Sequence, residues 1–158
     1  MIATFSAVLA SPEFLFQCSQ PGKLDDFALA ERLSFFLGES MPDETLSKLA
    51  RNGKLRDAGN LKKQVDRLID KPEFNRFVRE FLNSWLKLDE INDTDPDREL
   101  YPEYAGDWWL VSSMVKESQL FFADLIVNNR PASGLIDSDY TFLDERLARH
   151  YGVDGLQG

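Results

Sequence analysis

Apolar residues recur along most of the chain at the three- to four-residue spacing of amphipathic α-helices. The same spacing predicts helices over residues 2–10, from Ser40 or Asp43 to Gly53, and over residues 25–37, 57–70, 107–129 and 143–151. The widest apolar face falls in residues 72–88, which we expect at the centre of the core; its apolar members are Phe74, Phe77, Val78, Phe81, Leu82 and Trp85. No segment alternates with the two-residue period of a half-buried strand.

Residues that start or stop helices stand at the predicted boundaries. Asp25 is an N-cap type of residue before residues 26–37, and Gly38 is placed to end that helix. Pro42 is expected in the first turn of the next helix, where its missing N–H costs nothing. Gly53 and Gly152 fit the C-terminal ends of two further helices.

One long stretch, residues 89–105, lacks any helical period. It is acidic and contains two prolines, so we expect an ordered surface loop whose 101–104 end packs on the core. Together these patterns predict an all-α fold: a single-domain helical bundle of six to seven helices with one long acidic loop.

The amino-acid composition excludes several classes of protein. The 158 residues are 43% hydrophobic, which excludes an intrinsically disordered chain, and the net charge of −9 argues against a nucleic-acid partner. Cys18 is the only cysteine, so the chain is not a disulfide scaffold. No apolar run approaches the roughly 20 residues that cross a bilayer, so we expect no membrane span in this fragment.

Common catalytic and cofactor motifs are missing from the sequence. Without C-x-x-C-H the chain cannot attach a c-type haem covalently, and one histidine cannot supply a His-rich zinc site. No phosphate-binding or dinucleotide-binding glycine loop occurs either. We therefore expect no cofactor and no metal in this domain, and catalytic activity is left open.

Two polar residues near predicted apolar faces are candidates for function. His150 falls in the last turn of the final helix, where a charged imidazole meets the negative end of the helix dipole; alternatively it is a metal ligand or general base. Glu117 falls at the edge of the apolar stripe of the long helix. Arg32 could reach the same interior, giving either a structural Arg–Glu pair or a functional carboxylate.

Acidic and aromatic residues supply weaker candidates. Asp137, Asp139 and Asp144 could hold a hard cation, although we favour Asp144 in the first helical turn with Asp139 or Thr141 as its cap. Trp85 is expected to pack in the core. Of the adjacent pair Trp108 and Trp109, we expect one indole inside and the other at the rim, and Trp109 could stack on a sugar.

Several segments resemble one protein family. They are A-S-P-E-F-L-F at residues 10–16, L-A-E-R-L-S-F-F-L at 29–37, F-L-N-S-W-L at 81–86 and the closing motif D-Y-T-F-L-D-E-R-L-A-R-H-Y-G at 139–152. Together they resemble the domain of unknown function 1592 family, found in planctomycete-type multi-domain proteins that also carry cytochrome c modules. Two positions depart from the family pattern: Asp144 replaces its usual asparagine, and Gly38 stands where related domains often have tryptophan.

The resemblance implies a domain cut from a longer, exported protein. Residues 1–20 would then be the tail of a preceding small helical domain or an N-terminal helix, and residues 21–158 the helical domain of unknown function. Haem c is expected only in a separate module, and the implied location is periplasmic or otherwise extracytoplasmic. The implied partners are other domains of the same parent chain, including the cytochrome c module.

Two functions follow as hypotheses. The first is a non-catalytic helical scaffold or docking module. The second is a ligand-binding or enzymatic domain that acts on polysaccharide together with the cytochrome, using Arg32, Glu117, Asp139, Arg146 and His150 if they converge. An exposed aromatic patch would also leave room for an oligomerising role.

Overall fold

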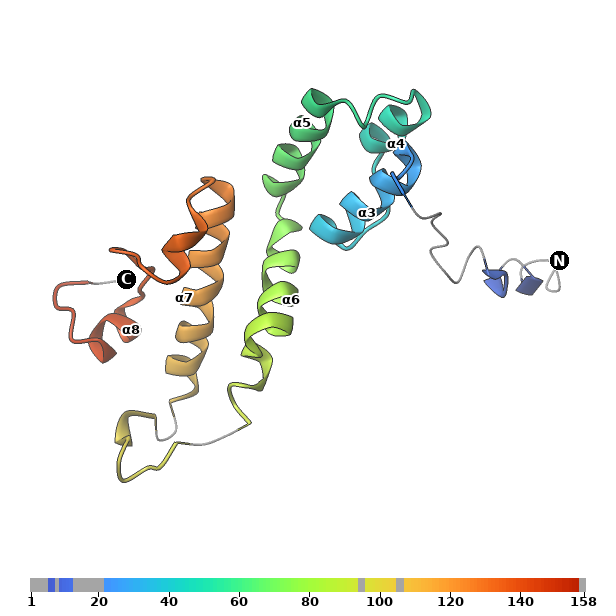
Figure 1. The fold of residues 1–158 in the computed structure, drawn as a ribbon. Coiled ribbons are helices and arrows are strands. Elements are labelled where there is room, and N and C mark those ends of the chain that lie inside the picture. Colours follow the sequence, from blue (N-terminus) through green and yellow to red (C-terminus); the bar gives the residue numbers. More distant parts are fainter. Residues whose placement is uncertain (1–5, 8, 13–21, 94–95, 105–106, 157–158) are drawn as a thin grey trace. The chain divides into compact units, whose positions relative to one another are not determined.

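The computed structural model describes residues 6–7, 9–12, 22–93, 96–104 and 107–156 (Figure 1). Within these ranges the chain is helical and contains no strand, which confirms the predicted all-α class. The described α-helices number six, close to the predicted six to seven: α3 (Asp26–Gly38), α4 (Glu44–Arg51), α5 (Ala58–Ile69), α6 (Phe74–Leu86), α7 (Trp108–Val127) and α8 (Glu145–His150). Three 3₁₀ turns join them: η1 (Leu88–Glu90), η2 (Pro102–Tyr104) and η3 (Ala132–Leu135).

The N-terminal segment is described only in part. Residues 6, 7 and 9 are helical, in agreement with the helix predicted at 2–10. Residues 13–16 of the motif at 10–16 and the predicted boundary after residue 20 lie outside the described residues. The chain forms two compact units. The first contains the described part of residues 1–36 together with residues 40–66, and the second contains residues 37–39 and the described part of 67–158.

Helix α3 in the first unit is held at its N-terminus by two consecutive aspartates. Asp25 caps the helix as predicted, because its Oδ1 accepts the Ala28 N–H at 2.8 Å. Asp26 is buried and accepts the Leu55 N–H at 2.7 Å and the Arg56 Nε–H at 2.6 Å. These two bonds fasten the start of α3 to the turn between α4 and α5.

Helix α4 has the caps that its sequence indicates. Asp43 is the N-cap, and its Oδ1 accepts the Leu46 N–H at 3.0 Å. Pro42 precedes this cap, so the expectation that it lies in the first turn is wrong. Gly53 takes the left-handed conformation, with φ of 63°, and ends the helix in a Schellman motif through the bonds Gly53 N–H to Ala50 C=O and Lys54 N–H to Leu49 C=O.

The end of α3 differs from the prediction by one residue. Gly38 is the last helical residue, and Glu39 takes the left-handed conformation instead, with φ of 48°. In the second unit, the Gly38 carbonyl accepts a hydrogen bond from Arg76 Nη2 at 3.2 Å. The Gly38 backbone therefore takes part in a contact with α6, and the left-handed turn falls on the next residue.

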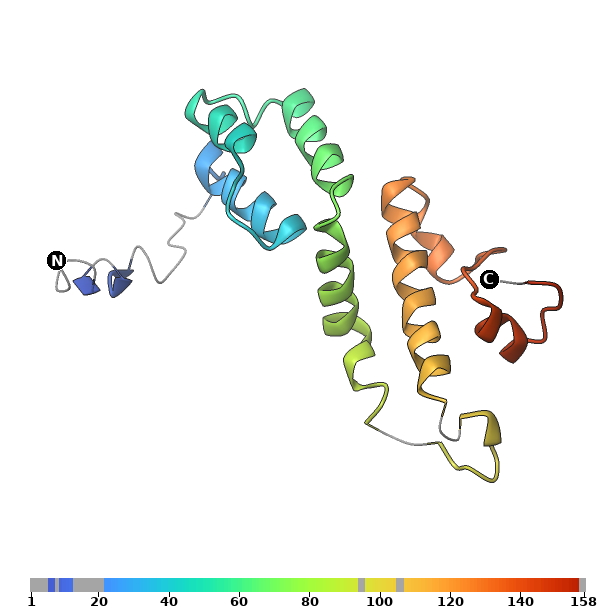
Figure 2. The same cartoon turned by 180° about the vertical axis from the view of Figure 1, so that it is seen from behind.

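Helices α6 and α7 form an antiparallel hairpin in the second unit, and they lie side by side in both views (Figures 1 and 2). The Phe81 ring stacks on the Phe122 ring with centroids 5.2 Å apart and planes 11° from parallel. On α6 the buried side chains are Phe74, Phe77, Val78 and Leu82, a subset of the predicted face. Trp85 contacts Phe122 at 6.4 Å but is 51% exposed, so its predicted place inside the core is wrong.

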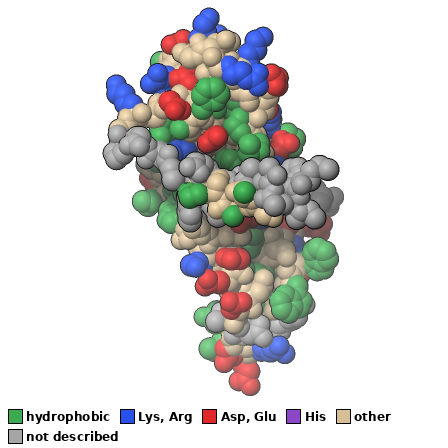
Figure 3. Space-filling model, turned by 90° about the vertical axis from the view of Figure 1, so that its right-hand side faces the viewer, with side chains coloured by type: hydrophobic (Ala, Val, Ile, Leu, Met, Phe, Trp, Pro, Cys, Tyr) green, Lys and Arg blue, Asp and Glu red, His purple; other side chains and the backbone are tan. Residues whose placement is uncertain are grey.

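The acidic connection between α6 and α7 is ordered over its described residues. Asp97 Oδ1 accepts the N–H groups of Glu99 and Leu100, at 2.8 and 3.1 Å, which closes a turn. Tyr104 fastens the 101–104 end to α7 as predicted, through its hydroxyl and the Met114 sulfur at 4.0 Å. Figure 3 shows acidic side chains gathered at the lower end of that view, where this connection lies.

Among the described helices, none combines the length and apolar character that crossing a membrane requires.

Replacing Leu82 with alanine tests the packing of the hairpin. Because Leu82 is only 1% exposed, the variant L82A should lose about 2–5 kcal/mol of unfolding free energy in urea titrations. The same substitution at Leu100, which is 73% exposed, is the matched control and should change stability by less than about 0.5 kcal/mol. Equal effects of the two substitutions would contradict this account of the core.

Candidate functional site: the closing motif on helix α7

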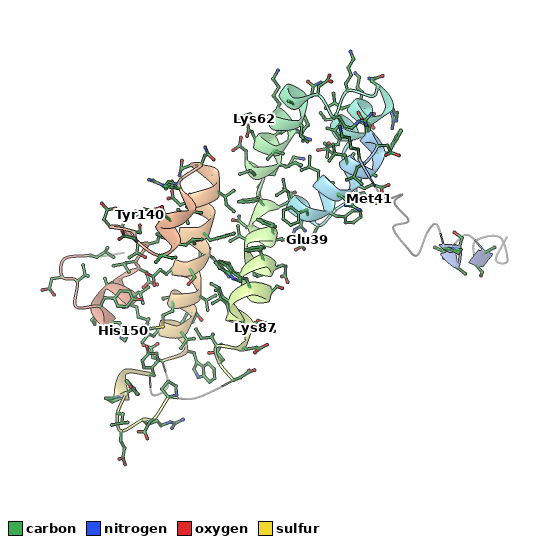
Figure 4. All side chains as sticks on the ribbon, viewed as in Figure 1. Glu39, Met41, Lys62, Lys87, Tyr140 and His150 are labelled. Carbon is green, nitrogen blue, oxygen red and sulfur yellow. The ribbon has the colours of Figure 1, made fainter. Side chains whose placement is uncertain are left out.

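The closing motif, residues 139–152, runs along α7 in the direction opposite to the helix. Figure 4 labels two of its residues, Tyr140 beside the C-terminal half of α7 and His150 beside the N-terminal half. Polar contacts join the two segments. The contacting pairs are Tyr140 with Asp124, Thr141 and Tyr151 with Glu117, Asp144 with Ser113, and Arg146 with Asp107. Much of the polar chemistry of the motif is thus directed at one neighbouring helix.

The α7 partners follow helical spacing. Ser113, Glu117 and Asp124 are four and seven residues apart, which places them on one face of α7. Helix α8 contacts α7, and its Leu147 and Ala148 are buried at 0% and 1% exposure. The face therefore combines a small apolar contact with a row of polar ones.

Asp144 is the N-cap of α8. Its Oδ1 accepts the Leu147 N–H at 2.8 Å, and its Oδ2 accepts the Ser113 hydroxyl. The Ser113 hydroxyl and the Leu147 N–H together hold the pKa of Asp144 below its ordinary value of 3.8. The expectation that Asp144 lies inside the first turn, with Asp139 or Thr141 as the cap, is wrong because the helix begins only at Glu145.

Glu117 is half-buried and accepts two hydroxyl groups of the closing motif. Its Oε1 accepts from Thr141, and its Oε2 accepts from Tyr151 at 3.0 Å. Burial, followed by the hydrogen bond to Glu117, raises the pKa of the Tyr151 hydroxyl. Glu117 thus has its partners within the second unit, whereas Arg32, its predicted partner, belongs to the first unit and is exposed on α3.

Arg146 connects α8 to the start of α7. Its Nη1 lies 2.6 Å from Asp107 Oδ2, while Asp107 Oδ1 accepts the Leu110 N–H at 3.1 Å and so caps α7. Burial alone would raise the pKa of Asp107, but the Arg146 guanidinium and the Leu110 N–H outweigh it and lower that pKa below 3.8. One carboxylate therefore caps one helix and binds the next.

Asp124 is the centre of a second group, at the other end of the motif. It accepts the Tyr140 hydroxyl at 2.8 Å and the Asn128 amide at 2.6 Å, and Arg130 Nε lies 2.7 Å from it. The Arg130 guanidinium also lies 4.9 Å from the centre of the Tyr140 ring. The hydrogen bond from Tyr140, partly opposed by burial, leads the interactions that lower the pKa of Asp124.

Sequence reasoning missed Asp107, Ser113 and Asp124 as site residues. The signal for Asp124 was present, because it follows Glu117 by seven residues and so repeats its position on the helix. Asp107 and Ser113 carried no comparable signal. Their partners are 39 and 31 residues away in the chain, and only the fold brings them close.

His150 lies in the last turn of α8, as predicted, and is half-buried. Its ring meets the Tyr104 ring edge-on at 5.5 Å and lies 5.4 Å from the Tyr151 ring. It lines a shallow surface hollow together with Asp107, Leu110, Arg146 and Arg149. Its aromatic contacts account for its position, and through Tyr151 it neighbours Glu117.

Asp139 is exposed beside Tyr140 and takes no part in the row of contacts on α7. Asp137, Asp139 and Asp144 do not form a cation site: within the described ranges no three His, Cys, Asp or Glu residues are grouped as metal ligands. Asp144 is turned to Ser113 and to the start of α8 instead.

Trp108 and Trp109 open α7 with both indoles exposed, at 66% and 72%. The expectation that one of them packs inside is wrong, because the buried position of this turn is taken by Leu110. Both aromatic rings are thus left on the surface.

Removing the Asp144 cap should loosen α8. The variant D144A is expected to lose at least the roughly 1 kcal/mol typical of a helix N-cap, since it also removes the Ser113–Asp144 hydrogen bond and leaves the Trp109 carbonyl as the acceptor of the Ser113 hydroxyl. Thermal and urea unfolding measure the loss. The neighbouring D139A is the control and should stay within about 0.5 kcal/mol of the parent chain, because Asp139 is exposed.

Four aspartates have a lowered pKa, so we expect the stability of the fold to depend on acid pH. They are Asp26, Asp107, Asp124 and Asp144. A carboxyl whose folded pKa lies below its unfolded value stabilises the fold fully above the unfolded pKa and loses that effect as the pH falls through the folded pKa. The unfolding free energy should therefore be level near neutral pH and decline as the pH falls past 3.8.

The variant D124N should show a shallower decline than the parent chain, because it removes one of these carboxyls. A stability that rises toward acid pH in the parent chain would contradict the assignment.

Comparison with known proteins identifies the family. The family model PSD4, described as a protein of unknown function (DUF1592), matches residues 24–153 and so includes α3 through α8. No curated protein and no solved structure matches the chain. The resemblance seen in the sequence motifs is thereby confirmed, and the chain belongs to the DUF1592 family.

Proposed function

We propose that this chain is a non-catalytic helical scaffold or docking module of a larger, exported protein that carries c-type haem in a separate module. The observation that carries the proposal is that four carboxylates where α7 meets the closing motif all have partners within the fold. Both oxygens of Asp107, Glu117, Asp124 and Asp144 accept hydrogen bonds or ion pairs from within the fold.

A catalytic carboxylate has different requirements. A general base needs an acceptor oxygen open to substrate and a pKa near the working pH. Three of these four groups have a pKa below 3.8, which makes them weak bases at neutral pH, and all four have their oxygens engaged by the chain itself. The arrangement suits a rigid structural unit better than a reactive one.

The chain's own residues and its family resemblance support the association with haem. With Cys18 as its one cysteine, the chain has no C-x-x-C-H pair to hold haem c, so a haem group would have to be bound by another module. A single cysteine is compatible with an extracytoplasmic location. Periplasmic placement and a cytochrome c partner domain are parts of the same proposal.

The first test is the native mass of the chain, purified without nickel and compared with its denatured mass. The proposal expects equal masses, since a structural module holds no ion or small ligand. Extra mass that disappears on denaturation would contradict it and would point to Glu117 and His150 as ligand-binding residues.

Two substitutions extend this test. E117Q should cost about 1 kcal/mol of stability through its weakened hydroxyl contacts, and H150A about 0.5–1.5 kcal/mol through its lost ring contacts. Neither should change the native mass. Loss of a bound species in either variant would overturn the structural role.

A further inference from the structure

All three tryptophans of the chain lie at one end of the α6–α7 hairpin, and all are exposed. Trp85 is near the C-terminus of α6, and Trp108 and Trp109 open α7, with exposures of 51%, 66% and 72%. We call the described residues from 85 to 109 the loop end. It also exposes Leu86, Leu100 and Tyr101.

Exposed tryptophans in one place are unusual. Tryptophan is highly buried on average, and covering a large apolar side chain is worth about 1.5–3 kcal/mol. Trp85 keeps half of its surface in water although it contacts Phe81 and Phe122. The loop end therefore has apolar surface left for a partner, of the residue type that most often carries binding energy in protein interfaces.

The charge of the same surface indicates what kind of partner fits. Residues 87–104 contain seven acidic and two basic residues, so they hold −5 of the net charge of −9. The described acidic side chains Asp89, Glu90, Asp93, Asp97 and Glu99 are exposed. Red and green side chains accordingly lie close together at the lower end of Figure 3. Apolar rings beside a carboxylate rim complement a partner with an apolar centre and a basic rim.

Two other occupants fit less well. Consecutive residues of an α-helix point about 100° apart, so Trp108 and Trp109 cannot form the flat platform on which a sugar chain would stack. A second copy of the chain would bring two surfaces of strong negative charge together, which costs binding energy.

We propose that the loop end is a docking surface for a folded protein domain whose face carries lysines and arginines around an apolar centre. The inference rests on the proposed docking role and names its surface and the chemistry of its partner. Trp108 and Trp109 supply the apolar contact, while the acidic side chains of residues 89–99 steer the basic face toward it.

Binding to two basic proteins tests the proposal. The probes are a basic single-haem cytochrome c and lysozyme, titrated into the chain by calorimetry at about 20 mM and 200 mM salt, because exposed charge pairs weaken as salt rises. We expect a saturable complex at low salt with at least one probe. W108A/W109A should weaken that complex about tenfold or more.

Matched controls separate this surface from general charge attraction. F27A/F35A removes two exposed aromatic rings from α3, and E31Q/D70N removes the same charge as D93N/E99Q from residues that do not belong to the loop end. Binding should weaken in D93N/E99Q and stay within about twofold in both controls. Circular dichroism checks that every variant is folded.

The outcomes distinguish the surface from the function. No saturable complex at low salt with either probe, or equal weakening by E31Q/D70N and D93N/E99Q, would overturn the loop end as a docking surface. Cytochrome c binding that W108A/W109A leaves unchanged would also overturn it, while leaving the proposed docking role intact. Lysozyme binding that depends on the tryptophans, without cytochrome c binding, would support the surface and count against the cytochrome partner. If sedimentation shows that the parent chain forms dimers and that W108A/W109A does not, the docking proposal is overturned in favour of self-association.

Discussion

The fold of the second unit depends on the row of carboxylates along α7. The closing motif, which these side chains bind, has few stabilising contacts of its own: α8 is six residues long, and its buried residues are Leu147 and Ala148. Isolated helices of that length are unstable in water because nucleation costs more than a few hydrogen bonds return. The contacts to Asp107, Ser113, Glu117 and Asp124 therefore decide where residues 139–152 lie.

Local features of this fold were predictable from the sequence. The caps formed by Asp25 and Asp43 and the left-handed turns at Gly53 and Gly152 involve residues within a few positions of one another. Glu39 shows where local reasoning fails: a left-handed turn favours glycine, yet it falls one residue after Gly38, whose carbonyl binds Arg76 from α6.

The candidate site was predictable only in part, for the same reason. Glu117, Arg146 and His150 lie in or beside the row on α7, and Asp139 lies outside it. Which partner each would find depends on contacts 24 to 46 residues apart in the chain. The exposure of Trp108 and Trp109 also depends on tertiary packing, because helical spacing alone does not show which part of a helix face is covered by another element.

The direction of the chain gives the row on α7 a consequence for biosynthesis. Residues 139–152 follow α7, so they leave the ribosome after it, and until then Glu117 lacks the hydroxyl partners that the closing motif supplies, whereas Asp124 already has Asn128 and Arg130. During that interval the hairpin must rely on the contact of Phe81 with Phe122 and on the buried face of α6. The order of translation thus presents the α6–α7 hairpin before the closing motif that binds its polar face.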